Sequence, residues 1–126
     1  MPLLQFDTTL SLSAAAKDSF AATVTELYTT EMETTAGHVA VTIREHDPAA
    51  LRLGRAVEGS LAFLDAEIRR GRPFERKRAF ALAVIDHVGT TFDIPRENTK
   101  VVFTEHAGED MMGADRVGGE WTDGSE

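Results

Sequence analysis

The residue with the most distinctive chemistry is Pro2, which directly follows Met1. Methionine aminopeptidases remove methionine before a small residue, and this would leave the proline nitrogen as a free secondary amine. An ordinary α-amino group has a pKa of about 7.7–8.0, and both burial and nearby positive charge lower it. A base that is neutral near working pH suits proton transfer. We therefore expect a proton-transfer site at Pro2; the alternative is a proline that merely tolerates the entry to a strand.

The second group of candidate residues is the basic run Arg69-Arg70-Gly71-Arg72. A guanidinium is always charged and can bind a carboxylate through two parallel hydrogen bonds. On a loop after a strand, Arg69 and Arg72 could converge on one anionic ligand, whereas Arg70 could face solvent. The alternative is a set of solvated loop charges without a ligand.

The elements that position these residues follow from an internal repeat. A shift of 60 positions aligns Lys17 with Lys77, Phe20 with Phe80, Val24 with Val84, Val41 with Val101, and Glu45-His46 with Glu105-His106. Each copy has the pattern of an apolar strand, a loop, an amphipathic helix and a second strand that ends in Glu-His. The sequence therefore predicts two tandem β-α-β units.

In the first copy we expect a strand at residues 3–6, a helix capped by Ser11 or Ser13 that runs to about Thr30, and a strand at 39–43. In the second copy we expect a strand from Ser60 to about residue 68, a helix that begins at Pro73, and a strand at 101–103. The inward helix stripes consist of apolar residues at spacings of three and four: Phe20, Val24, Leu27 and Tyr28, then Phe80, Val84 and Val88.

These elements predict an α/β (α+β) fold, with a four-stranded sheet and both helices on one face, because right-handed crossovers place the helices together. We expect a single domain over residues 1–126. Its repeats span about 2–46 and 62–106, with a connector at 47–59 and a C-terminal arm at 107–126. The other sheet face would stay exposed unless subunits associate through it, so we expect an oligomer.

Composition excludes several classes of function. The chain has 126 residues, no cysteine and a net charge of −8, which argues against disulfides, cysteine-ligated metals and a general nucleic-acid role. No apolar run is long enough to span a bilayer. We expect a cytoplasmic protein that binds neither nucleic acid nor membrane and uses no cofactor and no metal.

The Met-Pro strand, the motif Gly71-Arg72-Pro73-Phe74-Glu75-Arg76-Lys77-Arg78 and the strand Lys100-Val101-Val102-Phe103-Thr104-Glu105 together resemble the tautomerase superfamily. The resemblance covers nearly the whole chain. The length is similar to that of the longer, fused relatives of 4-oxalocrotonate tautomerase, such as cis-3-chloroacrylic acid dehalogenase. The resemblance implies a tautomerase/MIF-like fold, a homotrimer and an amino-terminal proline that acts as general base or acid.

The same resemblance implies roles for individual residues. Pro2 matches the catalytic proline, and Arg69 and Arg72 match the two arginines that hold the substrate carboxylate in the dehalogenase-like members. Lys100 falls where short members place an arginine that polarises the substrate carbonyl, and a surface lysine is the alternative. Met111 falls near their apolar wall residue.

Other positions depart from the dehalogenase pattern. Tyr28 stands where those enzymes have a histidine, and Val102 and Gly113 stand where they have the tyrosine and glutamate that activate water. Asp110 or Asp115 could supply the missing carboxylate, because the alignment beyond residue 106 is loose.

These departures favour keto–enol tautomerisation of a small unsaturated 2-oxo or 2-hydroxy carboxylate. Two alternatives stay open. One is a cofactor-independent hydratase or dehalogenase of 3-substituted acrylates, and the other is a catalytically silent trimer that binds a small anion.

Three further residues are candidates for a functional role. His46 and His106 end equivalent strands and could be metal ligands, but no third ligand with a recognisable spacing accompanies them. We therefore interpret them as polar strand ends. Trp121, near the C-terminus, could cover the site, and packing against a neighbouring subunit is the preferred interpretation.

Overall fold

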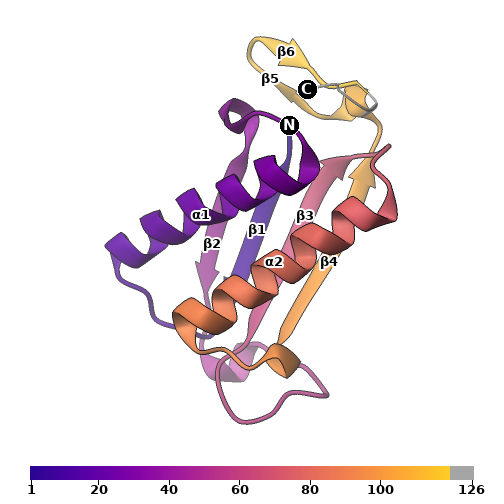
Figure 1. Ribbon diagram of the computed structural model, residues 1–126. Helices are drawn as coiled ribbons and strands as arrows, with labels where there is room; N and C mark the ends of the chain where they lie inside the picture. Colours follow the sequence, from indigo (N-terminus) through magenta and orange to yellow (C-terminus); the bar gives the residue numbers. More distant parts are fainter. Residues whose placement is uncertain (120–126) are drawn as a thin grey trace.

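Each copy of the repeat forms one β-α-β unit in the computed structural model, which describes residues 1–119. The first copy contains β1 (Leu3–Thr8), α1 (Ala14–Met32) and β2 (Ala40–Glu45), and the second contains β3 (Ala62–Arg69), α2 (Phe74–Phe92) and β4 (Thr99–His106). Figure 1 shows both helices on the same face of one sheet. The predicted fold class is therefore confirmed.

Local capping explains where the helices begin and end. Ser13 caps α1, because its hydroxyl accepts a hydrogen bond of 3.1 Å from the Ala16 amide. Pro73 precedes α2, where its missing N–H costs nothing. The helices end at Glu33 and Asp93, whose φ values of 51° and 57° are left-handed and break the helical path.

The sheet has the strand order β2-β1-β3-β4, and its centre is antiparallel. β1 pairs in parallel with β2, and β3 pairs in parallel with β4, whereas β1 and β3 run in opposite directions with Leu3 opposite Glu67. The start of β1 therefore lies at the same edge as the ends of β3 and β4. This pairing places the N-terminus next to Arg69.

Short elements connect and extend these units. Four 3₁₀ turns occur within residues 1–119: η1 (Ala36–His38), η2 (Pro48–Ala50), η3 (Arg96–Asn98) and η4 (Gly108–Asp110). After β4, the strands β5 (Met112–Gly113) and β6 (Arg116–Val117) form a small hairpin beside the N-terminus (Figure 1). Trp121, for which packing against a neighbouring subunit is the preferred interpretation, lies outside the described residues.

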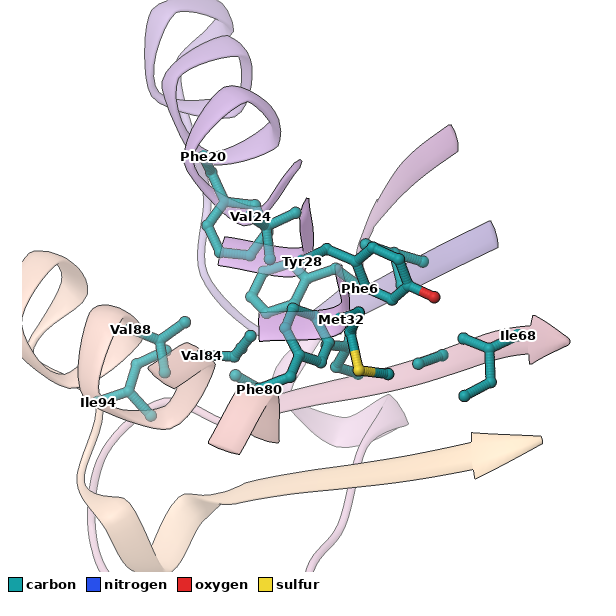
Figure 2. Packing of buried hydrophobic residues seen from close by; sticks show 14 residues of the cluster. Phe6, Phe20, Val24, Tyr28, Met32, Ile68, Phe80, Val84, Val88 and Ile94 are labelled. Atoms are coloured by element: carbon teal, nitrogen blue, oxygen red, sulfur yellow. The ribbon is translucent and has the colours of Figure 1, made fainter. Parts of the chain in front are cut away.

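The core lies between the sheet and the two helices (Figure 2). Alternate strand residues point toward the helices, as the period of two in a strand requires. The predicted helix stripes supply the other side of the core, except that Leu27 is only partly buried and that Met32 extends the first stripe. The fully buried large side chains include Phe6, Phe20, Tyr28, Met32, Phe80 and Ile68.

The opposite face of the sheet carries hydrogen-bonded polar side chains. Asp7 on β1 accepts hydrogen bonds from Arg44 at 2.9 Å and contacts His46 at 2.7 Å. Glu67 on β3 contacts His106 on β4 at 2.8 Å. These charged groups therefore bind one another within the chain. Burial of apolar area is not what would drive another subunit to bind this face. Within residues 1–119, no helix is long and apolar enough to cross a membrane.

The connector is held to the second unit by Asn98, whose side chain is fully buried. Its Oδ1 accepts from the Val57 amide at 2.8 Å, and its Nδ2 donates to the carbonyls of Val57 at 2.9 Å and Ser60 at 3.1 Å. Asn98→Ala should lower the free energy of unfolding by roughly 2–4 kcal/mol, because it leaves these backbone groups without partners. Denaturant unfolding measures this, with exposed Glu97→Ala as the control; an equal, small effect of both variants would contradict the assignment.

His87 on α2 should make stability depend on pH. Burial lowers the pKa of His87 below its ordinary 6.5, and within residues 1–119 its Nε2 has no hydrogen-bond partner. As pH falls through about 6.5, the unfolded chain takes up this proton before the folded chain does, so the free energy of unfolding decreases. Denaturant titrations at pH 7.5 and 5.5 should show a smaller decrease for His87→Leu than for the wild type. Equal decreases would exclude this role.

Candidate active site

The N-terminus enters the sheet between β2 and β3, and Pro2 is buried. Its carbonyl oxygen accepts a hydrogen bond of 3.0 Å from the Ala40 amide, which fixes the start of β1 against β2. The structure includes Met1, so the terminal amine belongs to that residue. The pKa of the Met1 amine is lowered from 8.0 to about 6, chiefly by burial and then by the positive charges of Arg69, Arg72 and Arg116, in that order.

A glycine turn brings the two predicted arginines to this end of the sheet. Arg69 ends β3, and Gly71 adopts a φ of 124°, which side chains with a Cβ rarely adopt. This turn directs the chain from Arg69 to Arg72 within three residues. Both arginines are buried, with exposures of 6% and 5%, although the sequence left open that they were solvated. Arg70 is exposed.

The two arginines differ in their surroundings. Arg69 Nη1 donates to the Gly119 carbonyl at 3.2 Å and borders a cavity at the N-terminus. Arg72 Nε donates to the Met32 carbonyl at 2.9 Å, and its guanidinium lies 5.6 Å from the centre of the Tyr28 ring. Arg72 therefore acts on the terminal amine from the helix side, and Arg69 is the one of the pair that lines the cavity.

The cationic cavity is lined by Met1, Arg69, Arg116, His38, Thr34, Thr35 and Gly118. It holds only about 10 Å³ in the presence of Met1, room for roughly one water molecule. Arg116 is a site residue that the sequence analysis missed. It lies on a strand of two residues, which is too short to produce a periodic pattern, so no sequence signal distinguishes it from the other arginines.

A second cavity, of about 260 Å³, also borders Met1. It is lined by Met1, Leu3, Glu67, His106, Asp110, Met111 and Met112. Met111 and Asp110 therefore border the same cavity as Met1. Asp115 lies between the two hairpin strands and is exposed. Met1 therefore borders both this acidic cavity and the cationic one.

Tyr28 lies behind the site rather than in it. Its side chain is 1% exposed, packs edge-on against Phe80 with ring centres 5.2 Å apart, and belongs to the core. Burial raises the pKa of Tyr28 to about 12, despite the opposing effect of Arg72 and Arg69. The phenol is therefore neutral at working pH, and its ring supports Arg72.

Lys100 and Val102 lie away from the N-terminus within one chain. Lys100 pairs with Phe63 near the start of β3, whereas His106, six residues later, pairs with Arg69. At about 3.3 Å per residue, six residues correspond to about 20 Å. A single chain therefore does not bring Lys100 or Val102 together with Pro2. The match to shorter proteins was made along the sequence, and it does not specify which end of β4 lies near the terminal amine.

Other features of the described chain do not form a comparable site. Within residues 1–119, no group of three or more His, Cys, Asp or Glu side chains is arranged to hold a metal ion. A hollow of about 370 Å³ lies between the connector and Leu61, at the opposite end of the sheet. Arg52 is the only ionisable residue among those that line it, so it lacks an acid–base pair.

The surroundings of the terminal amine give a direct prediction. In protein released from a fusion with Met1 retained, the amine should titrate at about 6 rather than 8.0. Arg116→Ala should raise this value, because removing a nearby positive charge favours the protonated amine. The pH dependence of N-terminal acylation, followed by mass spectrometry, measures it. Arg44→Ala, at the far end of β2, is the control and should leave it unchanged; an equal rise in both variants would contradict the local effect.

Comparisons with known proteins bear on the fold. No family model and no curated protein matches the chain. A member of the cis-3-chloroacrylic acid dehalogenase family has a TM-score of 0.83 at 22% identity, over 94% of this chain and 84% of that one. A fused 4-oxalocrotonate tautomerase (4-OT), described as a symmetric trimer, has a TM-score of 0.80 at 20% identity, over 92% and 94%.

A malonate semialdehyde decarboxylase inhibited by 3-bromopropiolate also matches, with a TM-score of 0.77 at 19% identity over 90% of this chain and 91% of that one. The names of these proteins cover different activities, and at these identities the likeness concerns the fold. The chain therefore has the fold of the tautomerase superfamily, as the sequence resemblance predicted.

Proposed function

We propose that the chain is a cofactor-independent tautomerase in which Pro2 becomes the terminal residue after removal of Met1. Its substrate would be a small unsaturated 2-oxo or 2-hydroxy carboxylate. The observation that carries this proposal is the buried end of β1, where burial and Arg69, Arg72 and Arg116 lower the pKa of a terminal amine to about 6. An amine with this pKa is largely neutral at pH 7 and can act as a base.

Removal of Met1 would also create room for the substrate. Met1 borders both the cationic and the acidic cavity, and its side chain reaches the hairpin, because a Cβ on Gly113 would lie 2.9 Å from Met1 Cε. Without this side chain, the two cavities would join in front of the Pro2 nitrogen. The substrate would occupy the place that Met1 fills in the structure.

The charges around this space favour one orientation of the substrate. Its carboxylate would bind Arg69 and Arg116, since guanidinium groups bind carboxylates through paired hydrogen bonds. Glu67 and Asp110 would repel the carboxylate from the opposite cavity. The Pro2 nitrogen would then remove a proton from the substrate, and the cations would stabilise the negative charge that develops on the enolate oxygen.

Assembly into a homotrimer is part of this proposal, and it is supported by the fused 4-OT described as a symmetric trimer. In such an assembly, Lys100 and Val102 of one subunit could approach the site of another. The open face carries charged side chains, so the trimer would bring polar surfaces together rather than bury a large apolar patch.

The proposal predicts an N-terminal proline that is essential for activity. Intact-mass analysis of protein expressed without a tag should show that Met1 is absent. Pro2→Ala should reduce the ketonisation of phenylenolpyruvate and 2-hydroxymuconate by about 10²-fold or more, because it replaces the positioned secondary amine with a primary one. Ultraviolet absorbance measures both reactions.

Arg44→Ala is the matched control, because Arg44 is exposed and lies at the far end of β2. Its rates should stay close to those of the wild type. Retained Met1, or equal rates for Pro2→Ala and the wild type, would sink the proposal and favour a silent anion-binding trimer. Halide release from 3-chloroacrylate at a higher rate than ketonisation would favour the hydratase or dehalogenase alternative.

A further inference from the structure

The open face of the sheet contains two histidine–carboxylate pairs that the repeat makes equivalent. His106 Nε2 lies 2.8 Å from Glu67 Oε1, and His46 Nε2 lies 2.7 Å from Asp7 Oδ1. A shift of 60 positions relates the members of one pair to those of the other. Because β1 and β3 are antiparallel, the pairs lie at opposite ends of the sheet, and the Glu67–His106 pair is the one beside the N-terminus.

The two pairs differ in what else binds the carboxylate. Asp7 is bound by Arg44 through both oxygens, at 2.9 and 3.1 Å, and this arginine holds the pKa of Asp7 below its ordinary value. The position equivalent to Arg44 in the second copy is Thr104. Glu67 instead accepts a hydrogen bond of 2.7 Å from the neutral amide of Gln5. Glu67 therefore faces the His106 ring without the two-oxygen arginine contact that Asp7 has.

The hydrogen bonds also specify which nitrogen of His106 can react. An ionised carboxylate only accepts hydrogen bonds, so Nε2 donates its proton to Glu67 and Nδ1 is the other, exchangeable position. In the described part of the chain, Nδ1 makes no hydrogen bond. Gln5 fixes the second oxygen of Glu67, so the amide, the carboxylate and the imidazole form one chain of contacts that orients the ring.

The surroundings of this ring place it at the proposed site. His106 and Glu67 line the cavity that Met1 borders, and their side chains are 32% and 29% exposed, so solvent can exchange protons with them. The charged groups near the ring are Glu67 on β3, Arg69 on the same strand, which is the cross-strand partner of His106, Asp110 on η4, and the terminal amine. The cationic cavity also borders Met1.

From this geometry we propose that His106, oriented by Glu67, is a second proton-transfer residue that acts opposite Pro2; this inference rests on the proposed function. Pro2 nitrogen removes the hydroxyl proton of the enol, and the O–H electron pair forms the C=O bond. The electrons of the C=C bond take a proton from Nδ1 of the His106 imidazolium. Pro2 ends as an ammonium and His106 as a neutral imidazole, and exchange with solvent restores both.

The pair at the other end of the sheet provides a matched control for the experiment. His106→Ala should lower kcat for phenylenolpyruvate ketonisation by about 10²-fold, with a much smaller change in KM, because proton transfer and not carboxylate binding is lost. Added imidazole should restore part of the rate. His46→Ala, which removes the same contact from the other copy, should keep the wild-type rate and show no response to imidazole.

A second variant, at Glu67, tests whether the carboxylate orients the His106 ring, separately from any effect on folding of the chain. Glu67→Gln keeps a hydrogen-bonding group beside the ring but removes the negative charge, so it should lower kcat with a much smaller change in KM. Equal rates for His106→Ala, His46→Ala and the wild type would overturn the inference while leaving the Pro2 proposal intact. A loss in His106→Ala without rescue by imidazole, in a chain with wild-type thermal stability, would also overturn it. If Pro2→Ala is fully active, the proposed function itself fails.

Discussion

The antiparallel pairing of β1 with β3 is the constraint on which the site depends. Within each unit the strands are parallel, so a single β-α-β unit would not bring its own start next to its own end. The antiparallel join places Leu3 opposite Glu67 and so sets the beginning of the first copy against the end of the second. The amine, the arginines after β3 and the histidine at the end of β4 meet only because of this join.

The charge around the terminal amine is opposite in sign to the net charge of the whole chain. The net charge is −8, yet three arginines act on the terminal amine. Local charges dominate there because burial removes the water that would otherwise screen them. Acidic groups are not excluded from this region, but they line a second cavity that also borders Met1, so the two neighbouring cavities differ in charge. Such a gradient orients an anion as well as attracting it.

Much of the fold could be predicted from the sequence. The two copies show the same strand–helix–strand pattern, and the apolar residues of each helix recur at spacings of three and four, as a buried helix face requires. The turn at Gly71 and the position of Arg69 follow from residues close together in the chain. The positions of Arg116 and Lys100 relative to the site could not be predicted from the sequence. Arg116 reaches the site through a hairpin that has almost no pattern, and Lys100 lies on a correctly predicted strand whose far end faces the amine. Both depend on long-range pairing rather than on local sequence.

The duplicated architecture also explains why one end of the sheet differs from the other. At the end of β1, the position equivalent to Pro2 is Ala62, whose nitrogen belongs to a peptide bond after Leu61 and cannot be a base. The histidine–carboxylate pair there is bound to Arg44, which neutralises the carboxylate and leaves a structural ion pair. At the end with the free amine, the arginine is replaced by Thr104 and the pair borders a cavity. The two copies thus keep the same contact, and they differ in the residue beside it, which in the proposed mechanism decides whether the histidine can transfer a proton.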